Sequence, residues 1–561
     1  MHSYDRYVRR PVMQFPQRQW PDRTIEEAPI WVSVDLRDGN QALIDPMMLS
    51  ERIKLFNLLL DMGFEQIEVG CPASSESDKK FIRTLIEDDL IPDGVTIQVL
   101  CDCDEDEIRS TFAAVDGASK VIVHICHPVS PIHRELYGMD QEAVLAVAKD
   151  AAGWVKKYAE DFDGEATFEY SPECFSETEP EFALSLCTAV QRIWEPTPEH
   201  PVIINLPATV ERTTPNVYAD QIEWMSRHFE NRESIILSVH MHNDRGTAAA
   251  AAELALLAGA QRVEGSLLGN GERTGNVDLL TLAYNLYSMG IDPKLNIEDS
   301  TKIVETWEQC TKMSVDERRP YVGKLVFTAF SGMHQDAITK GTERMRESGD
   351  NTWRMPYLAI DPTDIGRVYE PITEIGAQSV RGGVAHTMSK YYGFKLPKGM
   401  HREFEDAVQK ACGESGKADK EQIMDTFRRE YLYQNEPLHF RRIQVAEIQS
   451  DDDAAYDSRI RLIYTLGGET DQIRAEGKGP LDAVQRGFRD KYGIHIRILD
   501  YEEHALKAGS DSQAAAYIHM MDEDTGRITY GVGVSSNITR ASVRAIFSGV
   551  NRLGLVDQSE A

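Results

Sequence analysis

The sequence predicts an α/β protein that consists of a (β/α)₈ TIM barrel, helical linker subdomains and a small α/β domain with an internal pseudo-repeat. Eight short β-rich runs alternate with helical stretches over about 250 residues, the length and rhythm of such a barrel. Helical segments follow, and the composition then shifts towards short strands. We therefore expect an N-terminal extension and catalytic barrel at 1–300, linker subdomains at 301–437 and a C-terminal domain at 438–561.

The predicted strands are short runs rich in β-branched and aromatic residues. They are 30–38, 64–70, 95–101, 120–126, 165–173, 201–207, 234–244 and 262–269. Intervening segments such as SERIKLFNLLLDMG repeat apolar residues three and four apart and end in Gly, as amphipathic helices do. A doubly wound open sheet is the alternative, but the glycine fingerprint that it needs after the first strand is absent.

Composition restricts the class of protein. The chain has 561 residues, 42% of them hydrophobic, eight cysteines and a formal net charge of −31. The length predicts two or more domains, and the acidic balance argues against binding to nucleic acid or to an anionic membrane. We see neither a signal-peptide core nor an apolar run of roughly 20 residues, so we expect a cytoplasmic protein with reduced thiols.

Polar clusters follow several predicted strands, where barrel enzymes carry their catalytic groups. His240 and His242 lie two apart on the seventh strand, so their side chains share one face. Asp38 ends the first strand, two places away around a closed barrel. One carboxylate and two imidazoles suit a divalent ion that still binds substrate oxygens. Hydrogen-bonded strand histidines and a turn aspartate before Gly39 are the alternatives.

Five motifs in order, DLRDGNQ, SPE, LPATVERTTPN, HMHND and GNGERTGN, resemble those of the metal-dependent acyl-CoA condensing aldolases. That family includes isopropylmalate, homocitrate and citramalate synthases and hydroxymethylglutaryl-CoA lyase. The N-terminal FPQRQWPDRTIEEAPIWVSVDLRDGNQALIDPM and the later SGMHQDAI, PYLAIDPTDIGRVYE and GVGVSSNITRASVRAIFSGVNR most resemble its long-form 2-isopropylmalate synthases.

The resemblance implies a divalent-metal-dependent acyltransferase that condenses acetyl-CoA with 2-ketoisovalerate and water, giving 2-isopropylmalate and CoA. This reaction begins leucine biosynthesis. Homocitrate or citramalate synthase would share the metal chemistry and differ in the ketoacid pocket. A non-catalytic leucine sensor is the alternative from another class.

The resemblance also implies roles for particular residues. Asp38, His240, His242 and Asn276 would hold Mg²⁺, Mn²⁺ or Zn²⁺, although Asn276 also fits a helix N-cap. Arg37 would stabilise charge on the keto oxygen, or would be a surface cation.

Four further residues resemble substrate-contacting groups. Thr209 would bind the ketoacid carboxylate, and Glu272 would orient the thioester or a water molecule. His124 and Glu173 would contact substrate or support it. The alternatives are a strand-end cap for Thr209, an apolar barrel layer for His124 and a local ion pair for Glu173.

His334 and Tyr357 match residues that long-form synthases bring from a partner subunit. The resemblance therefore implies a homodimer, with His334 as base and Tyr357 as a donor to the enolate or thioester oxygen. It also implies K⁺ as a candidate activator. The alternatives are the start of a helix for His334 and a buried aromatic for Tyr357.

The C-terminal domain contains a faint repeat. QIRAEGKGPLDAVQRGFRDKYG and RITYGVGVSSNITRASVRAIFSGVNR each run from a strand through G-x-G into a helix, which predicts approximate twofold symmetry. Gly477 with Gly479, and Gly531 with Gly533, would let backbone approach an amino-acid carboxylate at helix N-termini. Simple turn geometry is the alternative. The second repeat resembles the regulatory domain of leucine-inhibited synthases, so we expect L-leucine to inhibit.

Overall fold

Eight parallel strands close into a barrel in the order of the sequence, with β1 paired to β8. The computed structural model describes residues 3–7, 13–349, 351–371, 375–376, 380–412, 417–432, 434–447, 458–506 and 512–556. They form two compact units. The first holds the chain up to Phe327 together with Ile360–Val368, and the second holds Thr328–Ala359 and the chain from Tyr369 onward.

The barrel strands confirm the predicted fold. They are β1 (Ile30–Ser33), β2 (Gln66–Gly70), β3 (Thr96–Asp102), β4 (Lys120–Pro128), β5 (Glu165–Glu173), β6 (Val202–Ala208), β7 (Ile235–Met241) and β8 (Arg262–Gly265). Three strands end earlier than the sequence suggests. The first, β1, passes into a π-helical turn, η3 (Asp35–Gly39), and β8 passes into a 3₁₀ turn, η6 (Leu267–Gly269). The predicted seventh strand extends to residue 244, whereas β7 ends at Met241.

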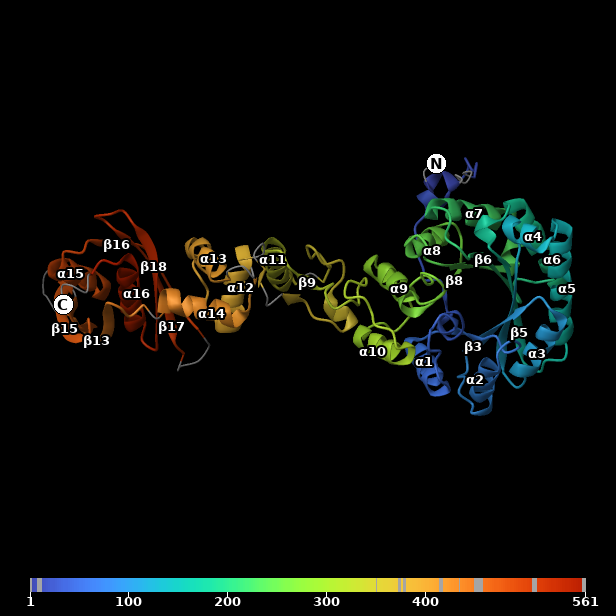
Figure 1. Cartoon of the computed structure of the whole chain (residues 1–561), viewed down its shortest axis with the longest axis horizontal. Coiled ribbons are helices and arrows are strands. Elements are labelled where there is room, and N and C mark those ends of the chain that lie inside the picture. Colours follow the sequence, from blue (N-terminus) through green and yellow to red (C-terminus); the bar gives the residue numbers. More distant parts are fainter. Residues whose placement is uncertain are drawn as a thin grey trace. The chain divides into compact units, whose positions relative to one another are not determined.

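Helices surround the strands (Figure 1). They are α1 (Leu49–Met62), α2 (Glu76–Glu87), α3 (Glu105–Val115), α4 (Pro131–Tyr137), α5 (Gln141–Ala159), α6 (Pro180–Trp194), α7 (Pro215–His228), α8 (Ala248–Leu257), α9 (Leu279–Ser288) and α10 (Ser300–Thr311). Helix α1 shows why they form: it buries Leu55, Phe56 and Leu59 and ends at Gly63, whose φ of 89° is left-handed.

The interior of the barrel is polar along part of its height. Glu68, Gln98, Glu169, Arg262 and Glu264 are all buried and contact one another through side-chain bonds. Apolar residues alternate with them along the strands and are buried as well. Burial of charged groups is tolerated here because each has a partner.

In the second unit, short helices precede two sheets. The helices are α11 (Gly332–Ser348), α12 (Val380–Tyr392), α13 (Lys398–Cys412) and α14 (Lys420–Phe427), with the π-helical turn η9 (Arg428–Leu432). Two-residue strands pair β9 (Thr328–Ala329) with β10 (Glu370–Pro371), and β11 (Ile375–Gly376) with β12 (Lys417–Ala418). The predicted boundaries at residues 300 and 437 remain predictions.

The internal repeat is visible as two units of three antiparallel strands and one helix. The first consists of β13 (Leu438–Glu447), β14 (Ser458–Leu466), β15 (Glu469–Gly477) and α15 (Pro480–Tyr492). The second consists of β16 (Ile496–Ala505), β17 (Ala514–Asp522), β18 (Ile528–Ser535) and α16 (Ile538–Leu553). Both units contribute to one hydrophobic core.

The predicted role of the G-x-G glycines as ligand-approach turns is wrong for the second repeat. Gly531 and Gly533 lie inside β18, not in a turn before the helix. A Cβ at Gly531 would lie 1.9 Å from the Ala545 carbonyl oxygen, and one at Gly533 would lie 2.1 Å from that of Ala541. These glycines therefore let α16 pack closely on the strand. In the first repeat, Gly479 is the N-cap of α15.

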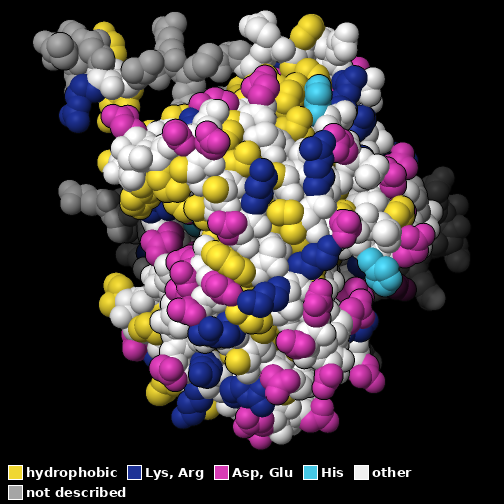
Figure 2. Space-filling view, turned by 90° about the vertical axis from the view of Figure 1, so that its right-hand side faces the viewer, with side chains coloured by type: hydrophobic (Ala, Val, Ile, Leu, Met, Phe, Trp, Pro, Cys, Tyr) yellow, Lys and Arg dark blue, Asp and Glu magenta, His cyan; other side chains and the backbone are white. Residues whose placement is uncertain are grey.

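Surface charge is mixed rather than segregated on the face drawn in Figure 2, where acidic and basic side chains intermingle. Within the described part of the chain, we find no helix that combines the length and the apolar character needed to cross a membrane.

Candidate functional site

A pocket of about 580 Å³ opens at the carboxyl ends of the barrel strands. It collects eight of the predicted site residues: Arg37, Asp38, His124, Glu173, Thr209, His240, His242 and Glu272. These residues come from or follow six strands, from β1 to β8. The closed topology therefore brings together motifs that are up to 235 residues apart in the sequence, from Arg37 to Glu272.

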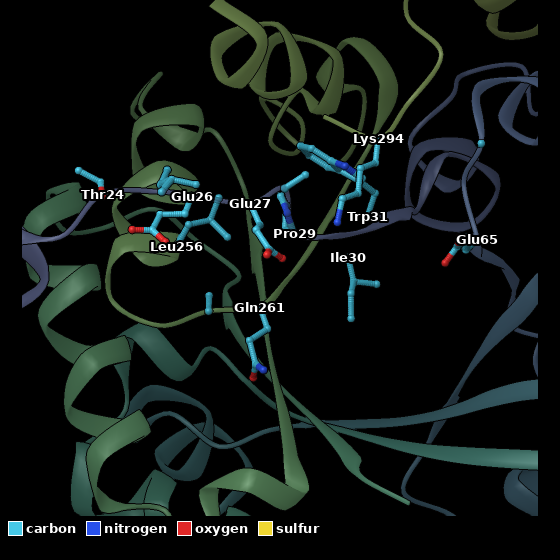
Figure 3. A pocket seen from close by; sticks show the side chains of 14 residues that line it. Thr24, Glu26, Glu27, Pro29, Ile30, Trp31, Glu65, Leu256, Gln261 and Lys294 are labelled. Atoms are coloured by element: carbon cyan, nitrogen blue, oxygen red, sulfur yellow. The ribbon is translucent and has the colours of Figure 1, made fainter. Parts of the chain in front are cut away.

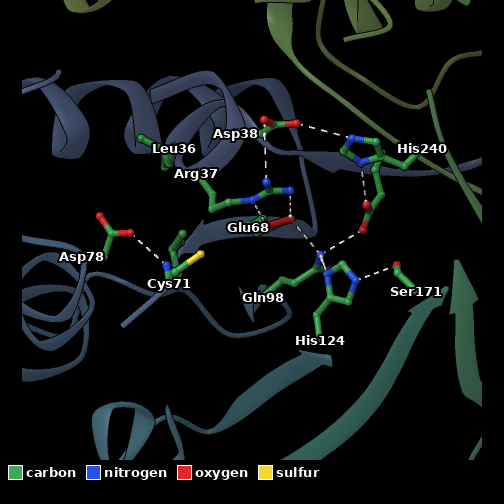
Figure 4. A network of polar contacts seen from close by, with 12 residues as sticks. Leu36, Arg37, Asp38, Glu68, Cys71, Asp78, Gln98, His124, Ser171 and His240 are labelled. Atoms are coloured by element: carbon green, nitrogen blue, oxygen red, sulfur yellow. Dashed lines mark hydrogen bonds and ion pairs between the residues drawn. The ribbon is translucent and has the colours of Figure 1, made fainter. Parts of the chain in front are cut away.

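The turn η3 presents Arg37 and Asp38 to the pocket. It is supported from below by Arg52, whose guanidinium donates to the carbonyl oxygens of Leu36 and Val69 at 3.2 and 2.8 Å. Arg52 also pairs with Asp78, whose carboxylate accepts from the Cys71 backbone N–H (Figure 4). The turn after the first strand is therefore fixed by hydrogen bonds and an ion pair.

Three side chains converge as a metal site requires. One ligand atom each from Asp38, His240 and His242 lies within 4.8 Å of the others, and all three residues are buried. The Asp38 Oδ2 atom is 3.4 Å from His240 Nε2 and 3.6 Å from His242 Nε2, and the two Nε2 atoms are 3.4 Å apart. A carboxylate with two imidazoles in this spacing fits a divalent ion.

The charges of this cluster follow from its contacts. Burial raises the pKa of Asp38, but the neighbouring Arg37 and both histidines hold it well below its usual range. Burial lowers the pKa of His240, but hydrogen bonds to Asp38 and Glu264 raise it to about 9. Burial and the charge of His240 lower the pKa of His242 to about 4. In the cluster without an ion, Asp38 is therefore ionised and His240 carries a proton that a bound cation would displace.

Asn276 lies beside the cluster, and its alternative interpretation as a helix N-cap is wrong. Its Nδ2 donates to Asp38 Oδ2 at 3.0 Å, and its buried Oδ1 has no hydrogen-bond partner among the residues that the structure describes. The N-cap of α9 is Asp278, whose side chain accepts from the Thr281 N–H. Asn276 is instead held opposite His242 by an isolated bridge.

Arg37 is mostly buried, so its alternative interpretation as a surface cation is wrong. Its Nε donates to Glu68, and its Nη1 is 3.7 Å from Asp38 Oδ1. Burial lowers the pKa of Arg37, but the carboxylates of Glu68 and Asp38 hold it above its usual value. The guanidinium therefore stays charged at the pocket.

Thr209 and Arg273 shape the opposite wall of the pocket. The Thr209 hydroxyl accepts a bond from the Cys174 N–H at 2.9 Å, and a hydroxyl that accepts one bond can also donate its proton. Arg273 donates to the Thr209 carbonyl oxygen at 2.5 Å and to Asp244 at 2.7 Å. Glu272, which precedes Arg273, also lines the pocket. Glu173 is another lining residue, and burial raises the pKa of its carboxyl group.

His124 lies among polar groups, not in the apolar layer that was its alternative. Its Nε2 is 2.7 Å from Ser171 Oγ, and its Nδ1 is 3.4 Å from Gln98 Nε2 (Figure 4). Burial lowers its pKa to about 3, so the imidazole is neutral at physiological pH. It lines the pocket and offers a neutral hydrogen-bonding surface.

A second group of side chains has the ligand types of a metal site, but the side-chain amide of Gln98 lies between them. Glu68, His124 and Glu264 have ligand atoms within 4.8 Å of one another. Gln98 Nε2 lies 3.0 Å from Glu68 Oε2 and 2.9 Å from Glu264 Oε1, in addition to its contact with His124. The amide group occupies the position that an ion would need.

Sequence reasoning missed these supporting residues. Glu68 in QIEVG, Gln98 in TIQVL and Glu264 in RVEG are polar residues in the middle of buried apolar strands. That pattern indicates a polar network inside the barrel, since a buried polar side chain needs a hydrogen-bonding partner.

His334 and Tyr357 belong to the second unit. Their rings stack with centroids 3.8 Å apart and an interplanar angle of 20°. His334 lies in the first turn of α11, as one interpretation expected. Tyr357 is 60% exposed with a φ of 66°, so its alternative interpretation as a buried aromatic is wrong.

Another pocket of about 580 Å³ lies at the amino ends of the strands (Figure 3). Its lining includes the segment 24–31 and Gly63, Glu65, Gln261 and Lys294. Since barrel enzymes carry their chemistry at the carboxyl ends, we assign no catalytic role to it.

Comparisons with known proteins agree with this architecture. Residues 28–306 match the HMGL-like family, residues 324–389 match the alpha-isopropylmalate synthase post-catalytic domain-like family, and residues 417–554 match the LeuA allosteric (dimerisation) domain. The last match points to a homodimer that binds a regulatory ligand.

Several relatives match almost the whole length of the chain. The chain is 47% identical over 554 residues to 2-isopropylmalate synthase of Clostridium acetobutylicum, with 98% of this chain and 99% of that protein covered. It is 46% identical over 555 residues to the enzyme of Ralstonia nicotianae (98% and 95% covered) and 47% over 549 residues to that of Mycobacterium ulcerans (95% and 96% covered). The chain belongs to the 2-isopropylmalate synthase family, acyltransferases with an HMGL-like barrel.

Proposed function

We propose that the chain condenses acetyl-CoA with 2-ketoisovalerate and water to give 2-isopropylmalate and CoA, the first committed step of leucine biosynthesis. The observation that carries this proposal is the buried cluster of Asp38, His240 and His242 beside the charged Arg37 at one pocket. A base takes a proton from the acetyl methyl group, the new carbon–carbon bond forms at the keto carbon, and water then cleaves the thioester.

The polar groups of the pocket divide this work. A divalent ion, Mg²⁺, Mn²⁺ or Zn²⁺, would be held by Asp38, His240 and His242 with Asn276, and when bound supplies Lewis-acid polarisation of the keto group. Arg37 stabilises negative charge on the keto oxygen during attack. Thr209 donates its hydroxyl proton to the ketoacid carboxylate, and Glu272 orients the thioester or the hydrolytic water.

The charges at the pocket favour 2-ketoisovalerate over 2-ketoglutarate. A second substrate carboxylate would need an available cation, whereas a branched apolar group needs none. Among the described residues that line the pocket, the arginines are Arg37 and Arg273. Arg37 is bound to Glu68, and Arg273 is bound to Asp244 and to a backbone carbonyl. The neutral His124 and its neighbour Ser171 complete this surface.

The second unit supplies the remaining groups in this proposal. His334 takes the methyl proton and Tyr357 donates to the enolate or thioester oxygen, each acting in the partner subunit of a homodimer. The stacked pair of rings presents both groups together. L-Leucine binds the C-terminal domain and inhibits, and K⁺ is a candidate activator.

Thiol release from acetyl-CoA tests the reaction. We would compare 2-ketoisovalerate, pyruvate and 2-ketoglutarate, each with and without a chelator and L-leucine. We expect chelator-sensitive release that prefers 2-ketoisovalerate and falls with leucine. Preference for another ketoacid would overturn the substrate assignment, and no release with any of them would favour a non-catalytic leucine sensor.

A further inference from the structure

We propose that Glu264 is a positioning residue that fixes the orientation and tautomer of His240 for metal binding. This inference rests on the metal site of the proposed function, but not on the choice of ketoacid. It assigns a task to a carboxylate buried below the pocket, which does not line the pocket itself.

The contact between the two side chains is direct. His240 Nδ1 lies 2.9 Å from Glu264 Oε2, and the two residues are paired in the register of β7 and β8. A carboxylate only accepts, so Nδ1 carries the hydrogen and donates it. In the neutral ring that would bind a metal ion, the other nitrogen, Nε2, offers its lone pair on the side of Asp38 and His242, each about 3.4 Å away.

The other histidine of the cluster has no such support. His242 Nδ1 is buried and lacks a hydrogen-bond partner in the described part of the chain. Glu264 therefore supports only one of the two histidines directly.

Glu264 is itself held by donors from four strands, β3, β6, β7 and β8. Its Oε1 accepts from Arg262 Nη1 at 3.0 Å and from Gln98 Nε2 at 2.9 Å. Its Oε2 accepts from Asn205 Nδ2 at 3.2 Å as well as from His240. Four donors on two oxygens leave this carboxylate one orientation, so it transmits a fixed geometry to the imidazole.

The same network reaches the catalytic cation. Gln98 Nε2 also donates to Glu68, and Glu68 holds Arg37, as Figure 4 shows for the labelled residues. One amide thus bridges the carboxylate that orients His240 and the carboxylate that orients Arg37. The metal ligand and the cation are placed relative to each other by the barrel interior.

The test measures binding of Co²⁺ to the metal-free, full-length protein. Loss of a carboxylate partner behind a ligating histidine typically costs about 10-fold to 100-fold in metal affinity. We expect Glu264→Gln to raise the Kd for Co²⁺ by that factor and to change the visible absorption bands of the bound ion. These bands report ligand geometry, so a purely structural role would not alter them.

Glu169→Gln is the matched control. Glu169 is equally buried, pairs with the same Arg262 at 3.2 Å and contacts Glu264, but among the described residues no hydrogen bond or ion pair joins it to His240. We expect its Co²⁺ affinity and spectrum to match those of the unaltered protein. If Glu264→Gln fails to fold because Arg262 loses a counter-ion, the double variant Arg262→Gln with Glu264→Gln removes that charge and is expected to show the same weakened binding.

The inference would be overturned if Glu264→Gln, or the folded double variant, bound Co²⁺ with the same affinity and the same spectrum as the unaltered protein. An equal loss in Glu169→Gln would overturn it too, because the effect would then be general to the barrel interior. Tight Co²⁺ binding without thiol release would instead contradict the proposed reaction and leave the role of Glu264 standing. No Co²⁺ binding by the unaltered protein would overturn both.

Discussion

Asp35 illustrates how one buried residue responds to its surroundings. Its Oδ2 accepts from the Ser33 hydroxyl and from the Leu267 N–H, each at 2.8 Å, and the Trp307 side chain lies close to the carboxyl group. Burial raises its pKa to about 7, although these hydrogen bonds oppose the shift. The carboxyl group is therefore protonated in the folded protein below that pH.

This shift predicts a pH dependence of stability. The pKa of Asp35 in the folded protein lies above the unfolded value of 3.8. The contribution of Asp35 to the free energy of unfolding is therefore full below about pH 4 and is lost as the pH rises towards 7. The loss amounts to about 4 kcal/mol at most, because each pKa unit is worth about 1.4 kcal/mol. We expect Asp35→Asn to remove it, so that the variant gains stability relative to the parent between pH 4 and 8.

Urea unfolding followed by tryptophan fluorescence at several pH values measures this difference. Trp31 and Trp307 are both buried in the barrel and report its unfolding. If the free energies of unfolding of the two proteins differed by the same amount at every pH, Asp35 would be ionised in the folded state across this range.

Arg37 makes a second prediction at this scale. Arg37→Lys keeps a positive charge but loses the planar fork that spans Glu68 while facing the pocket. We expect kcat to fall by about 10²-fold, a typical loss for one donor that stabilises a developing oxyanion. Metal content should stay at the parental level, and steady-state kinetics with metal analysis would check both. Unchanged kcat would remove Arg37 from the chemistry.

At the scale of single elements, α16 and β18 show why glycines recur in the C-terminal repeat. The helix packs so closely on the strand that any side chain at Gly531 or Gly533 meets helix backbone. The glycine pattern therefore encodes packing of the regulatory domain in this repeat.

We expect Gly531→Ala to destabilise the second unit by about 1 to 3 kcal/mol, as overpacking does in well-packed cores. Gly479→Ala is the control, because a Cβ at Gly479 would meet no atom within 4 Å and the φ of −169° there suits any residue. Its loss should be smaller, limited to a weaker N-cap. Thermal unfolding of the two variants side by side makes the comparison, and equal losses would contradict the packing explanation.

At the scale of the whole molecule, the proposed catalytic groups belong to two different units. Asp38 belongs to the barrel unit, whereas His334 and Tyr357 belong to the second unit. The match to a dimerisation domain makes a shared active site testable by mixing variants.

Asp38→Asn and His334→Ala should each abolish activity when purified alone. In a randomly assembled mixture, we expect recovery to about a quarter of parental activity, since half the dimers are mixed and each then has one intact site. Subunits refolded or coexpressed together and assayed for thiol release provide the measurement. A mixture as inactive as its parents would place His334 in the same subunit as Asp38.

Much of the barrel and of its pocket could be predicted from the sequence. The eight strands follow from short apolar runs, and the candidate metal ligands follow from polar residues where those runs end. Closure of a parallel barrel places all these ends on one rim, so local patterns are enough to gather Asp38, His240 and His242.

The remaining features depend on contacts between distant residues, which no local pattern contains. Asn276 binds Asp38 across 238 positions, and Gln98 binds Glu264 across 166. A polar residue inside a buried strand destabilises the fold unless a hydrogen-bonding partner faces it across the barrel. The sequence by itself thus determined the barrel, the family and the chemistry of the rim. Only the tertiary structure decided which side chains orient that chemistry, because side-chain hydrogen bonds form in space rather than along the chain.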